Sequence, residues 1–126
     1  SDWENPNFDD SPWQTGNGAF GAKESVEKWI GTPWNTKDIW LRRNFDYDGN
    51  AFSCAVLAIH FDNATEVFIN GKSVWKHDGW NEQYEGFDIT EALQGALQSG
   101  KNVIAIHCHQ DEGGQFIDAA IFVVSK

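Results

Sequence analysis

Two tryptophans, Trp34 and Trp80, occur among polar residues in stretches of this chain that favour loops. An indole ring can stack on the apolar C–H face of a pyranose, while amide and carboxylate side chains bond the hydroxyl groups of the sugar. The polar side chains that we assign to such a site are Asn81, Glu82, His109, Gln110, Asp111 and Gln115. These residue types predict a carbohydrate-binding surface. Alternatively, the two indoles only plug the end of a hydrophobic core.

Histidines form a second group of candidate residues. His107 and His109 are two positions apart, which places them on the same face of a strand, and we expect His60 to point away from the core as well. Three imidazoles on one sheet face could bind zinc, copper or iron. The simpler alternative, which we favour, is a pair of hydrogen-bonded histidines on a polar sheet face.

Catalysis is the third chemistry to consider. Asp78, Glu82, Asp111 and Glu112 could supply the two carboxyl groups that glycosidases place roughly 5 to 9 Å apart. The loops that would carry them are too short to form a lid that excludes water. The chain also lacks the Gly-x-Ser-x-Gly motif of many hydrolases. We therefore expect that the chain is not an enzyme.

The charge of the chain excludes some classes of partner. Nine Lys and Arg stand against 19 Asp and Glu, for a net charge of −10, whereas nucleic acids and anionic membranes are bound by clustered cations. No apolar run approaches the roughly 18 residues of a membrane span. Acidity suits solubility outside cells, so we expect a secreted protein, extracellular or periplasmic. The chain begins at Ser1 without a signal peptide, which favours a mature product or an excised module of a larger protein.

The pattern of short strands predicts one all-β domain over 1–126, an antiparallel β-sandwich with one short helix. Strands are expected at 38–47, 51–61, 65–69, 73–76, 84–89, 101–110 and 115–124, and the helix at 90–98 with Thr90 as its N-cap. Asn70-Gly71 is typical of a type I′ hairpin turn. Residues 1–37 have no sustained period. We expect them to wrap the core, with Trp3, Trp13, Trp29 and Trp75 packing against it.

Because each connection in an antiparallel sandwich reverses the direction of the chain, successive loops lie at alternate ends of the sandwich. The first end holds 48–50, the turn at 70–71 and the helix. The second end gathers 32–37, 62–63, 78–83 and 111–114, and with them Trp34, Trp80 and their polar neighbours. The sequence therefore places the candidate site at the second end.

The two cysteines, Cys54 and Cys108, fall on different faces of their strands. Leu57 and Ile59 are expected to face the core, which turns Cys54 outward, whereas Cys108 shares a face with the apolar Ile106. We therefore expect two free thiols, with a disulfide as the alternative if a β-bulge changes the register.

Five segments occur in an order that is typical of one family: Phe8-Asp9-Asp10-Ser11-Pro12-Trp13, then residues 39–45, 67–72, 87–90 and 100–106. Together they resemble the sugar-binding β-sandwich of family 2 glycoside hydrolases, within the galactose-binding-domain-like superfamily. The resemblance implies a jelly roll without catalytic residues or a required cofactor. Within these segments we expect Arg42 and Arg43 to pair with carboxylates. We expect Trp40 to lie in the core, with a position in a cleft as the alternative.

Two functions are consistent with this resemblance. The first is a carbohydrate-binding module that binds a polysaccharide or oligosaccharide for the catalytic domain of the same parent chain. The second is an accessory domain without a ligand, which packs on that catalytic domain through an apolar patch on one sheet face.

A structural calcium is a further expectation. The segment Gln115-Phe116-Ile117-Asp118 is similar to the last strand of some carbohydrate-binding modules, in which the Asp helps to hold calcium. Asp118 would then be a ligand, with Glu4, Asp9 or Asp10 as further oxygen donors. In the alternative, Asp118 bonds an arginine or backbone amides.

Overall fold

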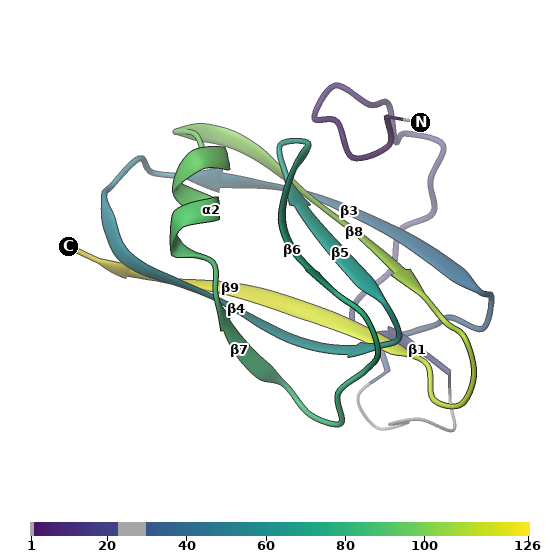
Figure 1. Cartoon of the computed structure of the whole chain (residues 1–126). Helices are drawn as coiled ribbons and strands as arrows, with labels where there is room; N and C mark the ends of the chain where they lie inside the picture. Colours follow the sequence, from purple (N-terminus) through teal and green to yellow (C-terminus); the bar gives the residue numbers. More distant parts are fainter. Residues whose placement is uncertain (1, 23–29) are drawn as a thin grey trace.

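Residues 2–22 and 30–126, which the computed structural model describes, form two β-sheets packed face to face (Figure 1). The five-stranded sheet has the order β2-β1-β9-β4-β7, and the four-stranded sheet has the order β3-β8-β5-β6. In chain order the elements are β1 (Phe20–Gly21), β2 (Thr32–Pro33), β3 (Asp38–Tyr47), β4 (Phe52–Asp62), β5 (Thr65–Ile69), β6 (Lys72–His77), β7 (Glu85–Asp88), α2 (Thr90–Ala96), β8 (Gly100–His109) and β9 (Phe116–Ser125). This architecture confirms the predicted β-sandwich.

Alternation along the strands explains why the sheets stack. On β4, Leu57, Ile59 and Phe61 face inward and are fully buried, because successive side chains of a strand point to opposite faces. Val67 of β5 and Ile106 of β8 belong to the same buried cluster and close it from the four-stranded sheet. Burying a side chain of this kind contributes roughly 1.5–3 kcal/mol. No helix in the described ranges is long and apolar enough to cross a membrane.

The cysteines follow the alternation. Both thiols are free, with Cys108 fully buried in the core and Cys54 half-buried on the outer face of β4. Burial also raises the pKa of the Cys108 thiol to about 11, so this thiol stays protonated at neutral pH. The expected pair of free cysteines is confirmed.

The first loop end is held together by the hairpin turn and the helix. Asn70 and Gly71 have φ angles of 51° and 84°, which confirms the type I′ turn. The Asn70 side chain donates to the carbonyl of Ala96 at 2.9 Å and to the amide oxygen of Asn102 at 2.8 Å. These bonds tie β5, α2 and β8 together at the end away from the candidate site.

Two local expectations differ from the structure. The lead-in contains two short strands, because Phe20 and Gly21 pair with the first residues of β9. Strands of two residues leave no period in a sequence. Thr90 is also not the N-cap of α2: Ile89 holds that position, and the Thr90 hydroxyl accepts the N–H of Ala55 at 2.9 Å instead. The hydroxyl therefore ties the start of the helix to β4.

The N-terminal residues lie on the outer face of the four-stranded sheet, as expected of a wrapping segment. Arg42 of β3 holds them: its guanidinium donates to the carbonyls of Trp3 and Asn5 at 2.6 and 2.9 Å and pairs with Asp10 at 2.8 Å. Trp3 packs edge-on against Phe68 of β5. Trp13 and Trp75 also pack against aromatic rings, whereas Trp29 lies outside the described residues.

Candidate functional site

Four loops meet at the second end of the sandwich, as chain reversal predicted (Figure 1). We call this end the loop rim; its loops are 34–37, 63–64, 78–84 and 110–115. Asn63 joins two of them, because its Oδ1 accepts the N–H of Asp111 at 2.9 Å and its own N–H donates to the His109 carbonyl at 3.2 Å. Its carbonyl also accepts the Thr65 hydroxyl at 2.8 Å. The loop rim is therefore fixed by internal hydrogen bonds.

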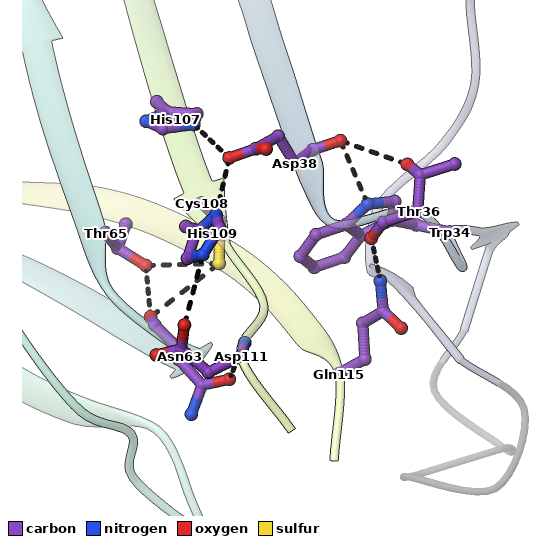
Figure 2. A network of polar contacts seen from close by, with 10 residues as sticks. All are labelled: Trp34, Thr36, Asp38, Asn63, Thr65, His107, Cys108, His109, Asp111 and Gln115. Carbon is purple, nitrogen blue, oxygen red and sulfur yellow. Dashed lines mark hydrogen bonds and ion pairs between the residues drawn. The ribbon is translucent and has the colours of Figure 1, made fainter. Parts of the chain in front are cut away.

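A chain of hydrogen-bonded acidic and histidine side chains runs along the outer face of the four-stranded sheet toward this rim (Figure 2). Oδ1 of Asp38 lies 2.8 Å from Nε2 of His107 and 2.8 Å from Nδ1 of His109. The other ring nitrogen of His109 lies 3.1 Å from Oδ1 of Asp111. The predicted pair of hydrogen-bonded histidines on a polar sheet face is confirmed, with Asp38 as the bridge.

These contacts shift the proton affinities of the groups. The hydrogen bond with Asp38 raises the pKa of His109, and the charges of Asp38 and Asp111 act in the same direction. Desolvation by itself would raise the pKa of Asp38, but the bonds to the two histidines outweigh it and lower that pKa. The arrangement favours an ionised Asp38 beside a protonated His109.

Trp40 is exposed beside this chain of groups, contrary to the expectation that it lies in the core. Its ring stacks on His107 with the centroids 5.2 Å apart and the planes at 13°, and 47% of its surface is exposed. Because His107 is bonded to Asp38, the indole rests on an imidazole that is itself held in place. Trp40 therefore presents a supported aromatic surface to solvent.

Trp34 is buried, in agreement with the alternative that it plugs the end of the hydrophobic core. The residue is 5% exposed and belongs to the hydrophobic core, with its indole N–H donating to the Asp38 carbonyl at 3.2 Å (Figure 2). Its backbone N–H donates to the carbonyl of Gly21 at 2.8 Å, which holds Trp34 next to β1. Trp34 thus has no exposed ring face, and the plug interpretation applies to it.

The side chains of two residues that we expected to be available at the surface, Asn81 and Gln115, are hydrogen-bonded to the backbone. The Asn81 side chain accepts the N–H of Phe61 at 2.8 Å and donates to the Ile59 carbonyl at 3.0 Å, so it takes the place of a neighbouring strand at the edge of β4. Gln115 is 6% exposed and donates to the Thr36 carbonyl at 2.5 Å. Both side chains hold loops in place.

The other predicted residues remain at the surface of the loop rim. Trp80 is 62% exposed, Glu82 is exposed, and Gln110 is half-buried with a long contact of 3.5 Å to the Gly113 carbonyl. Trp80 forms a β-bridge with Asp62, whose pKa is raised to about 6 by burial. The structure therefore leaves the predicted surface with one exposed indole rather than two.

A groove on the side of the sandwich was not foreseen from the sequence. This side groove has a volume of about 650 Å³ and lies where the N-terminal segment passes β3 and β9. Trp13 and Trp40 both line it. Its apolar lining also includes Phe20, Leu41, Ile104, Ile106 and Ala119, and its polar lining includes Gln14, Asn17, Arg43, Asn44 and Asp118. Indoles, aliphatic groups and amides thus meet in one concave surface.

The two arginines of β3 differ in a way that the sequence did not suggest. Arg42 pairs with Asp10, as expected, and its side chain is 3% exposed. Arg43 is exposed and lines the side groove, and within the described ranges no hydrogen bond or ion pair involves its side chain. The expectation that Arg43 pairs with a carboxylate is therefore wrong.

The three-histidine metal site is also wrong. His60 lies on the five-stranded sheet, where its ring packs against Phe116 with the centroids 4.3 Å apart, whereas His107 and His109 belong to the four-stranded sheet. In the part of the chain that the structure describes, no three His, Cys, Asp or Glu residues are grouped to hold a metal.

Of the residues expected to hold calcium, Asp118, Asp9 and Asp10 are engaged in other contacts, whereas Oε2 of Glu4 is buried without a hydrogen-bond partner among the described residues. Asp118 accepts the hydroxyl hydrogen of Tyr84 at 2.5 Å, while Asp10 pairs with Arg42. Asp9 accepts the backbone N–H of Ser11 at 3.0 Å within its own turn. Calcium stays a prediction of the resemblance alone.

The fold and the side groove together define a jelly-roll β-sandwich with an aromatic-lined surface. No protein-family model matches this chain, and no curated protein sequence is a significant match. Solved structures do share its fold. A family 2 glycosyl hydrolase from Bacteroides cellulosilyticus aligns with 95% of this chain at a TM-score of 0.59 and 16% identity, and the match covers 18% of that hydrolase.

Two further solved structures show the same likeness. A β-glucuronidase from glycoside hydrolase family 2 aligns with 92% of this chain at a TM-score of 0.58 and 17% identity, over 15% of its own length. An α-L-rhamnosidase from Streptomyces avermitilis, in complex with L-rhamnose, aligns with 71% at a TM-score of 0.56 and 23% identity, over 9% of its length. The likeness confirms the predicted sandwich fold, and the chain corresponds to one small part of each of these longer proteins.

Proposed function

We propose that this chain is a non-catalytic carbohydrate-binding domain of a larger glycosidase-like protein, and that its glycan lies in the side groove. The observation that carries the proposal is Trp40, a half-exposed indole stacked on His107 at the edge of a groove that Trp13 also lines. A sugar ring can stack on such an indole while amides bond its hydroxyls. Asn17 and Asn44 offer amides of that kind in the same groove.

The side groove is a better glycan site than the loop rim. At the rim, Trp34 is buried, and the side chains of Asn81 and Gln115 are already bonded to the backbone. Trp80 retains an exposed ring, but the side groove combines a concave shape with two indoles. Concave, aromatic-lined sites bury more of a ligand than a flat surface does.

The proposal is for binding without catalysis. A glycosidase needs one carboxyl group to act as an acid and a second to act as a base or nucleophile. Of the carboxylates that line the side groove, Asp10 is paired with Arg42 and Asp118 accepts a hydrogen bond from Tyr84. Such engaged carboxylates suit positioning more than proton transfer.

Calorimetric titration with a set of soluble plant and algal oligosaccharides tests this function. Trp40→Ala is expected to weaken binding at least about tenfold, or ~1.4 kcal/mol, because the stacking surface is lost. The matched variant Trp80→Ala removes an exposed indole from the loop rim and is expected to leave affinity unchanged. Binding that is lost in Trp80→Ala and retained in Trp40→Ala would move the site to the rim.

An accessory domain is the second candidate function, and a specific surface favours it. Phe122 and Val124 of β9 are 61% and 58% exposed and stand beside Val56 and Cys54 of β4 on the outer side of the five-stranded sheet. We call this surface the apolar face. Exposed apolar patches commonly mark protein contacts. If no glycan binds, while Phe122→Ser removes self-association of the chain at high concentration, a packing role is the better account.

A further inference from the structure

The side groove has a distinct electrostatic character. Two of the described residues that line it are cations, Arg42 and Arg43. The guanidinium of Arg42 is saturated by Asp10 and by three backbone carbonyls, those of Trp3, Asn5 and Phe8, and its side chain is 3% exposed. It is therefore closed to a ligand, and the donors of Arg43 remain.

Arg43 is placed to face a ligand in the side groove. It is exposed, and its partner across the ladder is Ile104 of β8, which also lines the groove. Leu41, on the same face of β3, lines the groove as well. The guanidinium thus emerges from an aliphatic surface that carries no charge of its own.

The negative charges of the side groove are already engaged. Asp10 lies 2.8 Å from Arg42, and the carboxylate of Asp118 accepts the Tyr84 hydroxyl at 2.5 Å. Within the described ranges, no carboxylate lies within ion-pair distance of the Arg43 guanidinium. Arg43 therefore stands in the groove without an ion-pair partner among these residues, although the Asp118 carboxylate in the same groove keeps its negative charge.

We propose that the side groove selects acidic sugars, with Arg43 binding the carboxylate of a uronic acid residue while Trp40 stacks on a sugar ring. This inference rests on the proposed function of the groove. A guanidinium matches a carboxylate in a two-pronged, charge-assisted hydrogen bond, which is stronger and more directional than a bond to a hydroxyl. Asn44, next to Arg43 in the chain and in the groove, is available for a hydroxyl of the sugar.

The acidity of the whole chain does not prevent this binding. Charges further apart than about 8 Å are largely screened at physiological ionic strength, so contact groups decide the affinity. The net charge instead slows association at low salt, because it repels an anionic glycan at long range. The association rate for an acidic oligosaccharide is therefore expected to rise with added salt, opposite to the behaviour of a basic protein.

The test compares each uronic acid oligosaccharide with its own methyl ester, which keeps the ring and the linkages but removes the negative charge. Calorimetric titration of the folded chain is run with oligogalacturonides and with glucuronic acid oligosaccharides. The free acid is expected to bind at least about tenfold more tightly than its ester. Arg43→Gln is expected to abolish this preference, so that the free acid and its ester bind with equal affinity, and Arg43→Lys to retain part of it.

Each other outcome overturns the inference in a recognisable way. Equal affinity for acid and ester would show that the groove does not select charge, and the glycan-binding function would stand. An equal loss of both ligands in Arg43→Gln would assign Arg43 to hydroxyl groups. If neither acidic nor neutral glycans bind, the proposed function fails together with this inference. Thermal unfolding of each variant confirms that the fold is intact.

Discussion

At the scale of single residues, Asp38 organises the surface beside the side groove. Its carboxylate holds the rings of His107 and His109, each at 2.8 Å, and Trp40 rests flat on the first of them. Its carbonyl accepts the indole N–H of the buried Trp34. One residue at the start of β3 thus connects the hydrophobic core to the exposed aromatic surface.

The bond between Asp38 and His109 makes stability depend on pH. Because the folded pKa of His109 is raised, its contribution is present below the unfolded value of about 6.5 and is lost as the pH rises through the folded pKa. Because the folded pKa of Asp38 is lowered, the contribution of Asp38 is lost as the pH falls through its folded pKa, below its ordinary value of 3.8. The pair therefore stabilises the fold most in mildly acid solution.

His109→Gln is accordingly expected to lower the melting temperature more at pH 5.5 than at pH 8.5. Differential scanning calorimetry at the two pH values measures this difference. In the Asp38→Asn background the difference between the two pH values should become smaller, because Asp38 is neutral there and only Asp111 still acts on the pKa of His109. An equal effect of His109→Gln in the original chain at both pH values would contradict the account.

The sequence pattern is least able to predict which tryptophans are buried and which are exposed. Trp34 follows a proline in a polar stretch and looks exposed, yet the pairing of 20–21 with β9 draws it into the core. Trp40 alternates with Ile39 and Leu41, which pack against the core, and that alternation was the available signal that Trp40 faces outward. The burial of Trp34 depends instead on the tertiary placement of the short strands β1 and β2, which leaves no local signal.

At the scale of elements, Arg42 is the anchor between β3 and the N-terminal segment. It makes four hydrogen bonds to that segment with a nearly buried side chain. Arg42→Gln leaves Asp10 without its cation and three carbonyls without their donor. We expect a loss of about 2 kcal/mol in the free energy of unfolding, because the carbonyls lose a charged donor while Asp10, whose side chain is 39% exposed, can be solvated.

Arg43→Gln is the matched control for this prediction, since the neighbouring arginine is exposed on the same strand. Its effect on stability should stay within about 0.5 kcal/mol. Urea denaturation of both variants gives the comparison. Similar losses in the two variants would show that Arg42 does not hold the segment.

Strands with a clear alternation of apolar and polar residues could be predicted from the sequence. The expected bounds of the strands at 38–47 and 65–69 agree with β3 and β5, and the Asn70-Gly71 turn has the expected φ angles. Alternation over ten residues, or a turn that demands positive φ, leaves a local signal. The two-residue strands β1 and β2 depend on partners far along the chain and leave none.

At the scale of the whole molecule, the sandwich presents two surfaces of different character. The side groove lies between the N-terminal segment, β3 and β9, and the apolar face lies on the outer side of the five-stranded sheet. The two surfaces share no residue, so a glycan bound in the proposed groove would not compete with a protein partner on the apolar face. From the sequence we predicted a glycan site at the loop rim, because the end at which each loop lies follows from the reversal of the chain. The path of residues 10–20 across β3, which forms the side groove, has no such signal in the sequence.

The most direct test of the account follows the indole N–H signals of the chain by NMR during titration with the oligosaccharide that binds in calorimetry. The signals of Trp13 and Trp40 are expected to shift together and to saturate at the calorimetric affinity, while the signal of Trp80 stays in place. A saturating shift of Trp80 with no change at Trp40 would contradict the account.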